Sequence, residues 1–139
     1  SESFQIFHPG GKLGAQMTKI REMMHVGNKI PLVTPEMSMQ SALIEMTSKG
    51  FGIAVLINFG KIAGIISDGD LRRHMHHLME KSAGEIASPD PVTVGKDAFA
   101  ADALRIMNSK KISVLIVADE DNRAIGILHI HDLLRVGVA

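Results

Sequence analysis

The stretch Gly64-Ile65-Ile66-Ser67-Asp68-Gly69-Asp70-Leu71-Arg72-Arg73 has a related copy in this chain at an offset of 62 residues, in which Gly64, Ile65, Asp70, Leu71 and Arg73 recur. The second copy reads Gly126-Ile127-Leu128-His129-Ile130-His131-Asp132-Leu133-Leu134-Arg135. Earlier positions repeat with an offset of 61: Val33, Ala42, Leu43 and Met46 return as Val94, Ala103, Leu104 and Met107. This self-similarity indicates that one structural unit of about 60 residues is built twice.

The first copy predicts a short strand around Val33 and then a helix, because apolar residues at 39, 43 and 46 have helical spacing. Gly50 is suited to end that helix. Two apolar runs follow, at residues 53–57 and 62–66, and the glycine-containing turn between them predicts a hairpin. A last helix is expected after Asp70, with one apolar face formed by Leu71, Met75 and Leu78.

The second copy predicts the same elements in the same order. They are a strand around Val94, a helix at 98–108, strands at 112–117 and 124–128 separated by a polar turn, and a helix that begins near Asp132. Residues 80–91 join the copies, and a serine, a glycine and two prolines interrupt any periodicity there. The predicted fold class is α/β (α+β), with two β-α-β-β-α units that share a core by pseudo-twofold packing, because one such unit alone buries too little surface.

Composition excludes several classes of function. Fifteen basic and fifteen acidic residues give zero net charge, which disfavours a nucleic-acid partner. The chain has no cysteine, so disulfides and thiol chemistry are excluded, and a reducing cytoplasmic location is expected. No wholly apolar run is longer than residues 53–57, which is far shorter than the roughly 20 residues of a membrane-spanning helix.

The doubled unit resembles a tandem CBS domain pair, also called a Bateman module. The resemblance lies in Gly64-Ile65-Ile66-Ser67-Asp68-Gly69-Asp70, which matches the family's Gly-aliphatic-aliphatic-Ser/Thr-x-x-Asp segment. In that family the segment ends a strand at a nucleotide cleft. The resemblance therefore implies that Ser67 and Asp70 face the phosphate and ribose of a nucleotide, and hydroxyl and carboxylate groups suit those partners.

A narrower resemblance covers nearly the whole chain. Phe7-His8-Pro9-Gly10-Gly11-Lys12-Leu13-Gly14 is similar to the junction between a sugar isomerase domain and its CBS pair in the arabinose 5-phosphate isomerases, and both copies of the motif above agree. These enzymes interconvert ribulose 5-phosphate and arabinose 5-phosphate in the synthesis of the sugar Kdo. The resemblance implies an isomerase domain outside this chain, with residues 1–19 as tail and linker, 20–79 as CBS unit 1 and 80–139 as CBS unit 2. His8 would then be an active-site candidate of the whole enzyme, while this fragment alone is not expected to be catalytic.

Further ligand-binding candidates follow from the resemblance and from repeat equivalence. Asp132 corresponds to Asp70, but His129 replaces Ser67, which places the second site in doubt. Either arginine after the first motif could bind a phosphate or a sugar carboxylate, and the alternative is a solvated helix face. The remaining candidates flank the first strand or form a wall for the base, with a core role as the alternative for the apolar ones. The arginines are Arg72 and Arg73, and the residues that flank the first strand are Lys29 and Thr34. The wall candidates are Ile53 and Ala54, with Val114 and Leu115 at the wall positions of the second copy.

The histidines do not predict a metal site. His76 and His77 are neighbours on an expected helix and should point apart, and no carboxylate set completes a tetrahedral site. No cofactor is required, and two hypotheses remain. The chain senses a nucleotide or nucleotide sugar, either CMP-Kdo or an adenine nucleotide such as AMP or ATP, and adjusts an attached isomerase domain. Alternatively, it is a structural homodimer or tetramer element with an empty cleft.

Overall fold

The computed structural model describes residues 11–138 and contains two three-stranded sheets, one for each repeat. In the first sheet, β1 (Leu32–Val33) pairs in parallel with β2 (Ala54–Asn58), which pairs antiparallel with β3 (Lys61–Ile66). The second sheet repeats this order with β4 (Thr93–Val94), β5 (Val114–Ala118) and β6 (Ala124–His129). The predicted order of elements and the α+β fold class are confirmed. Each sheet with its helices is called a unit below, unit 1 for β1 to β3 and unit 2 for β4 to β6.

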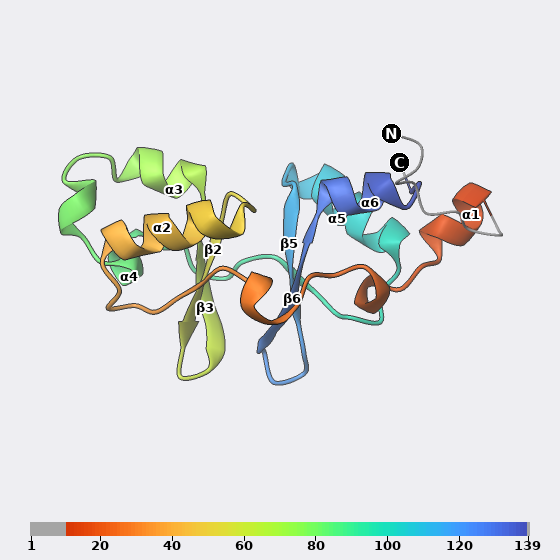
Figure 1. Cartoon of the computed structure of the whole chain (residues 1–139), viewed down its shortest axis with the longest axis horizontal. Helices are drawn as coiled ribbons and strands as arrows, with labels where there is room; N and C mark the ends of the chain where they lie inside the picture. The colour runs from red at the N-terminus through yellow and green to blue at the C-terminus, as the bar shows by residue number, and fades with distance from the viewer. Residues whose placement is uncertain (1–10, 139) are drawn as a thin grey trace.

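The units lie side by side, and both hairpins point to the same end of the molecule (Figure 1). The helices of the two units lie mostly toward the opposite end. The α-helices are α1 (Gly11–Gln16), α2 (Met39–Lys49), α3 (Asp68–Arg73), α4 (Ala83–Ile86), α5 (Ala100–Lys110) and α6 (Ile130–Arg135). Single 3-10 turns are η2 (Ile20–Glu22), η3 (Gly27–Lys29) and η4 (Leu78–Glu80).

Repeat-equivalent helices α2 and α5 begin and end by local chemistry. The Ser38 side chain accepts the backbone N–H of Ser41 at 3.2 Å and starts α2. That helix ends at Gly50, whose φ of 79° is left-handed, as the sequence predicted. Its equivalent Lys111 ends α5 with a φ of 57°. A lysine is therefore held in a left-handed conformation at the end of unit 2's long helix, where unit 1 has a glycine.

Helix α3 differs from the prediction. It was expected to begin after Asp70 and continue past Met75, but it begins at Asp68 and ends at Arg73. The backbone N–H of Ser67 donates to the Asp70 carboxylate, so the helix starts one turn earlier than the apolar spacing suggested. Met75 lies beyond the helix and is 62% exposed, so the predicted apolar face is wrong at that position.

The connection at residues 80–91 contains a helical turn that the sequence analysis missed. Helix α4 begins after Ser82, whose backbone N–H donates to the Glu85 carboxylate at 2.9 Å. A serine followed three residues later by glutamate is a known helix-start signal, and it could have predicted this turn. Ala83 and Ile86 are buried in the core of unit 1, so the connection is a structural part of that unit.

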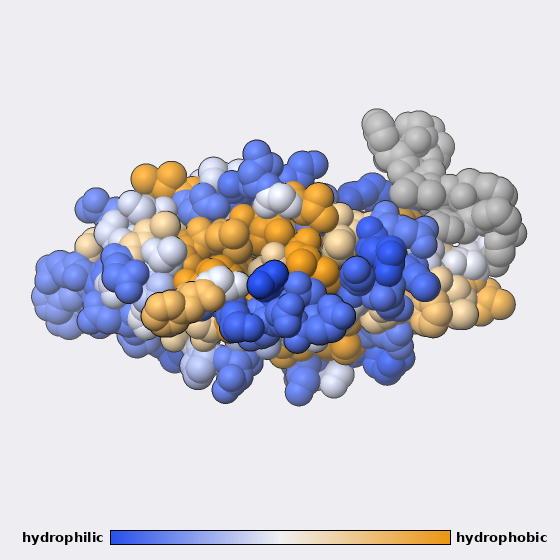
Figure 2. Space-filling view, turned by 90° about the horizontal axis from the view of Figure 1, so that it is seen from below, coloured by the Kyte–Doolittle hydropathy of each residue, from blue (hydrophilic) through white to orange (hydrophobic). Residues whose placement is uncertain are grey.

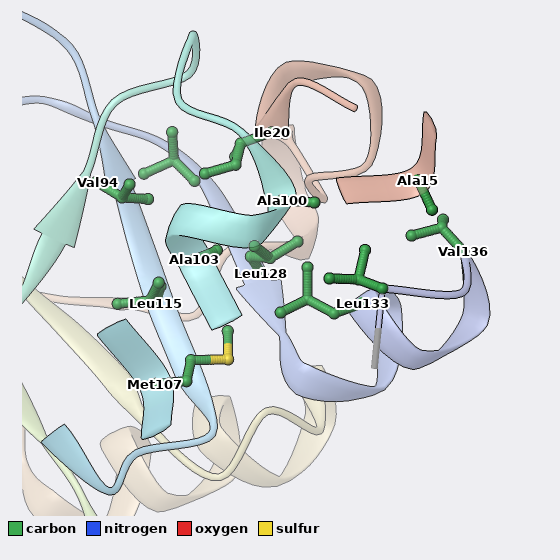
Figure 3. Packing of buried hydrophobic residues seen from close by; sticks show 12 residues of the cluster. Ala15, Ile20, Val94, Ala100, Ala103, Met107, Leu115, Leu128, Leu133 and Val136 are labelled. Atoms are coloured by element: carbon green, nitrogen blue, oxygen red, sulfur yellow. The ribbon is translucent and has the colours of Figure 1, made fainter. Parts of the chain in front are cut away.

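The segment that precedes unit 1 completes the core of unit 2 in the same way. Ala15 and Ile20 pack against α5, α6 and the second sheet (Figure 3). Ile20 is fully buried, which stabilises the fold by about 1.5–3 kcal/mol relative to an exposed side chain. Each unit is thus closed by the segment that precedes the other unit. Residues 20–25 and 83–88 are called the crossing segments below.

A third core cluster joins the two sheets. Val55 of β2 and Ile116 of β5 are both buried in it, as is Ile127 of β6. The hairpin ends also meet, because the backbone N–H of Ile62 donates to the carbonyl oxygen of Asn122 at 2.9 Å. Seen from this end, hydrophobic residues gather near the middle of the molecule and hydrophilic residues lie on either side (Figure 2). The two units therefore share a core, as expected for units of this size.

Within residues 11–138, no helix is both long and apolar enough to cross a membrane.

Candidate functional site

Two glycines let the crossing segments pass close to the sheets. A Cβ atom added at Gly64 would lie 2.7 Å from the carbonyl oxygen of Ser88, and one added at Gly126 would lie 2.5 Å from the Met24 sulfur. Beside each glycine, the strand exchanges two backbone hydrogen bonds with the crossing segment. Ile65 pairs with Ser88 and Ile127 pairs with His25, each through two bonds of 2.9 Å. The repeated glycine thus has a physical role, because it brings Ser88 and His25 to equivalent places.

Ser88 and His25 each contact the aspartate of the neighbouring motif. In unit 1, Asp70 is 1% exposed and accepts hydrogen bonds from four donors. The backbone N–H and hydroxyl of Ser67 donate to its Oδ2 at 2.9 and 3.0 Å, and Arg73 and the Ser88 hydroxyl donate to its Oδ1. The carboxylate therefore ties together a strand end, the first turn of α3 and a crossing segment.

This network sets the ionisation of Asp70. Burial opposes the charged form, but hydrogen bonds from Ser88, Ser67 and Arg73 outweigh it and hold the pKa of the Asp70 carboxyl below its ordinary value. Asp70 is therefore a charged anchor, and its oxygens already have partners. A ligand that bonds to Asp70 must replace one of these donors.

A cleft of about 510 Å³ opens beside this anchor and is called the first cleft. Its size lies within the range of about 300–1,000 Å³ typical of small-molecule sites. Three parts of the chain converge on it: the motif of unit 1, the strand starts of both units, and the end of the connection. The lining residues are Phe51, Gly52, Ile53, Ile65, Ser67, Asp68, Gly69, Pro89, Asp90, Pro91, Val92, Lys111, Ile112, Ser113 and Val114.

Some of the candidates from sequence lie in this cleft. Ser67 and Ile53 line it, as does Val114 from unit 2. Others lie behind its wall, since Asp70 and Ala54 are buried and Leu115 belongs to the core of unit 2.

The other first-copy candidates do not line the first cleft. Arg72 and Arg73 are exposed on α3, and Arg73 directs its guanidinium to Asp70 at 2.5 Å. Lys29 is exposed at the end of η3, and Thr34 is exposed after β1. His8 lies outside the described residues.

Three charged residues in the cleft were not among the candidates. Asp68 and Asp90 supply carboxylates, and Lys111 supplies the cation. Asp68 lies within the repeated motif, so its position was a usable signal. Lys111 could have been found through repeat equivalence, because it corresponds to Gly50 beside the predicted wall. Asp90 gave no local signal, since its place in the cleft depends on the path of the connection.

Unit 2 has a different set of side chains at the equivalent place. Asp132 is 4% exposed and accepts the backbone N–H of His129 at 2.8 Å, together with a bond from Arg135. In unit 1 the Ser88 hydroxyl donates to Asp70, and in unit 2 His25 takes the equivalent place. Its Nε2 lies 3.0 and 3.1 Å from the two Asp132 oxygens. His131 donates its backbone N–H to the Nδ1 of His129 at 3.1 Å.

That last bond determines the state of His129. A ring nitrogen that accepts an N–H carries no proton, so His129 is neutral with its proton on Nε2. Burial and the neighbouring His131 hold the pKa of His129 below its ordinary value, although Asp132 acts in the opposite direction. A neutral histidine can still donate to a phosphate through Nε2, but it brings no charge.

The other histidines form no recognisable site. Among residues 11–138, no group of three or more histidine, cysteine, aspartate or glutamate side chains could hold a metal ion. The prediction that His76 and His77 point apart on a helix is wrong. α3 has already ended, His77 has a φ of 61°, and the two rings lie 4.0 Å apart.

Comparison with known proteins agrees with this architecture. The family model for the CBS domain matches residues 20–77 and 83–139, one match for each unit. The chain therefore belongs to the CBS domain family and carries two CBS domains.

The curated relatives include arabinose 5-phosphate isomerases. The chain is 42% identical to arabinose 5-phosphate isomerase KdsD of Pseudomonas aeruginosa and 38% identical to KdsD of Escherichia coli K12, with 99% of this chain aligned in both cases. It is also 41% identical to the uncharacterized protein RP505 of Rickettsia prowazekii. The chain spans only 43–44% of the length of these relatives.

Solved structures share the fold. The crystal structure of CBSX2 in complex with AMP has a TM-score of 0.75 and 25% identity, and the match covers 85% of this chain and 94% of CBSX2. The CBS domain of a bacterial CNNM/CorC family Mg²⁺ transporter in complex with ATP has a TM-score of 0.74 and 20% identity, with 91% of both chains covered. The second of these likenesses concerns the fold alone.

Proposed function

We propose that this chain is the ligand-sensing CBS pair of a cytoplasmic arabinose 5-phosphate isomerase, and that it binds a nucleotide or nucleotide sugar in the first cleft. The observation that carries the proposal is the composition of that cleft. Hydroxyls of Ser67 and Ser113 and the Lys111 ammonium lie beside apolar walls that include Ile53 and Val114. Apolar walls suit a base, and the Ser113 hydroxyl and the Lys111 ammonium suit a sugar phosphate, whereas the Ser67 hydroxyl donates to a phosphate only if it turns away from Asp70. The similarity to KdsD supports the link to an isomerase, and the AMP complex of CBSX2 supports a nucleotide ligand.

We propose different roles for the aspartates near the motif than those expected from the sequence alone. Asp68 and Asp90 line the cleft and are the carboxylates available to a ribose diol. Asp70 holds Ser67 and Ser88 in position from behind the wall. In this arrangement Asp70 shapes the cleft, and it reaches the ribose only if the Ser67 or Ser88 hydroxyl turns away.

Charge favours a ligand with few negative charges. Two carboxylates and one ammonium line the first cleft, so its local charge is not strongly positive. A nucleoside monophosphate or a nucleotide sugar with one phosphodiester fits this balance better than a triphosphate without Mg²⁺. CMP-Kdo, as the activated end product of the pathway, is the proposed feedback ligand, and AMP or ATP is the alternative. Either ligand would regulate the attached domain only if it binds one arrangement of the pair and that domain more tightly than another.

Isothermal titration calorimetry tests the proposal with CMP-Kdo, CMP, AMP and ATP on this chain. We expect at least one of them to bind below millimolar concentration and ATP to bind more weakly than AMP. The variant Lys111→Gln should lower the affinity by about 3- to 10-fold, because it removes the cation of the cleft but keeps the side-chain size. Lys110→Gln is the matched control, since Lys110 is the neighbouring residue on α5 and does not line the cleft. Absence of binding by all four ligands would show that nucleotide sensing is wrong.

An oligomerisation role is the second candidate, and one surface favours it. Ile44 and Met79 are 70% and 48% exposed, and together with Leu43 they line a groove along α2. The equivalent groove along α5 has Arg105 in place of Ile44. Sedimentation velocity of Ile44→Glu against the unchanged chain tests this surface. A dimer that persists in the variant would show that the groove along α2 is not the contact.

The two candidates are separated by Asp70→Ala. A sensing pair should lose ligand affinity when the anchor is removed and should keep its oligomeric state. A purely structural pair has no ligand affinity to lose.

A further inference from the structure

Three small residues of unit 1 are each replaced by a histidine in unit 2. Repeat equivalence places His129 at the position of Ser67 and His131 at the position of Gly69. The structure adds the third replacement. Ser88 contacts Asp70 and His25 contacts Asp132, and each is paired by two backbone hydrogen bonds with the equivalent strand residue. Near Asp132, unit 2 therefore has three histidines where unit 1 has two serines and a glycine. This place is called the second cleft below.

The His25 ring contacts both the buried carboxylate Asp132 and the aromatic ring of Phe51. Its Nε2 donates to both oxygens of Asp132, and its side chain is only 29% exposed. It also packs edge to face on Phe51, with ring centroids 5.2 Å apart. Phe51 lines the first cleft, and it is also the repeat equivalent of Ile112, which forms part of the same apolar wall, so repeat symmetry places Phe51 beside the second cleft as well. The ring of His25 thus covers the wall that a base in the second cleft would need.

The other two rings lie against each other at the motif of unit 2. The ring centroids of His129 and His131 lie 4.4 Å apart, and the backbone N–H of His131 holds the His129 ring through Nδ1. His129 is half-buried and His131 is exposed. In the first cleft the equivalent positions carry a hydroxyl and a glycine, and both line open space.

We propose that His25, His129 and His131 close the second cleft, so that the pair binds a single nucleotide, in the first cleft. This inference rests on the proposed function and assigns the two halves of the repeat different roles. A ligand in the second cleft would have to separate His25 from Asp132 and from Phe51. Separation would leave a 4% exposed carboxylate with one donor fewer, and an uncompensated buried charge is costly. In the first cleft, the small Ser88 satisfies Asp70 without filling the space in front of it.

Calorimetry of the unchanged chain with AMP measures the stoichiometry directly. We expect one equivalent per chain, with the imidazole ¹H–¹³C signals of His129 and His131 unshifted at saturation; His25 is left out of this readout because it packs on Phe51, which also lines the first cleft. Two equivalents, or shifts of the His129 and His131 signals, would overturn the closure and leave the proposed function standing. Absence of AMP binding would count against the adenine-nucleotide form of the proposed function, and the closure is then tested on the free chain.

The closure is visible without ligand in the ¹⁵N spectra of the imidazole rings. Bonding to Asp132 should keep a proton on Nε2 of His25, and the N–H of His131 should keep Nδ1 of His129 unprotonated. Tautomer-averaged shifts for both rings, as for free histidine, would overturn the inference.

Substitution provides the third test. His25→Ser with His129→Ser and His131→Gly copies the first cleft into the second, and we expect two equivalents of AMP. The matched control makes three comparable changes outside both clefts, His74→Ser, His76→Ser and His77→Gly, and should keep one. If the triple variant does not fold, His25→Ser alone retains a hydroxyl for Asp132 and should show a second, weaker binding event. A folded variant that still binds one equivalent would contradict the closure.

Discussion

Gly64, the glycine of β3 that recurs as Gly126, should not tolerate replacement by alanine. A Cβ at Gly64 would lie 2.7 Å from the carbonyl oxygen of Ser88, whereas ordinary contact begins at 3.4 Å. The obstacle is backbone, so the crossing segment must retreat by about 0.7 Å, the difference between these distances. The two hydrogen bonds between Ile65 and Ser88, each 2.9 Å long, would then lengthen to about 3.6 Å and be lost.

Loss of two backbone hydrogen bonds at about 0.5–1.5 kcal/mol each gives a destabilisation of about 1–3 kcal/mol for Gly64→Ala. In a chain of this size the melting temperature should fall by about 4–12 °C. Far-UV circular dichroism in heat and in urea is the suitable assay, because the chain has neither tryptophan nor tyrosine as a fluorescent probe. The shift of Ser88 also displaces the adjoining wall of the first cleft, so AMP affinity should fall as well.

Gly95→Ala is the matched control. A Cβ at Gly95 meets nothing within 4 Å, and its φ is not left-handed. This change should leave stability unaltered or raise it by about 0.4–1 kcal/mol, because alanine restricts the unfolded chain. If Gly64→Ala proves as stable as Gly95→Ala, the crossing segment does not depend on the glycine, and the reasoning is refuted.

Three further changes test other parts of the structure. Ile20→Ala should cost about 2–5 kcal/mol in urea unfolding, because the side chain is fully buried in unit 2, and a cost below 1 kcal/mol would contradict the crossing of residues 20–25. Burial disfavours the charged form of Asp70, but hydrogen bonds from Ser88, Ser67 and Arg73 outweigh it and lower its pKa. Its stabilising contribution is therefore complete above the unfolded value of about 3.9 and is lost as the pH falls through the folded pKa. Urea unfolding of Asp70→Asn should show a weaker loss of stability below pH 4 than the unchanged chain, and parallel curves would contradict this. Phe59 is 95% exposed on a hairpin tip, so Phe59→Ser should change stability by less than about 0.5 kcal/mol, and a larger loss would show that the tip is packed.

The order of elements could be predicted because it depends on local patterns. The spacing of Met39, Leu43 and Met46 and the glycine after that helix are signals within a few residues, and the repeat doubled each of them. The parts that sequence did not show depend on contacts distant in the chain. Ile20 packs beneath unit 2 and Ala83 beneath unit 1, and neither position carries a local signal of its partner.

The candidate site was predicted in part for the same reason. Ser67 lines the first cleft, and the motif could point to it because the strand end and helix start are local, while its role toward a ligand stays a prediction. Asp70 was expected to face the ligand, but its oxygens bond to Ser67, Ser88 and Arg73, and Ser88 lies in the connection, 18 residues further along the chain. Lys111 enters the cleft from unit 2, so its place beside the motif of unit 1 depends on the packing of the two units.

A crystal structure of this chain grown with AMP measures the central claim most directly. We expect one nucleotide per chain, in the first cleft, with its phosphate near Ser67 or Lys111 and the rings of His25 and His129 unmoved. A nucleotide bound beside Asp132, or one bound away from both clefts, would contradict the assignment of the sensing site.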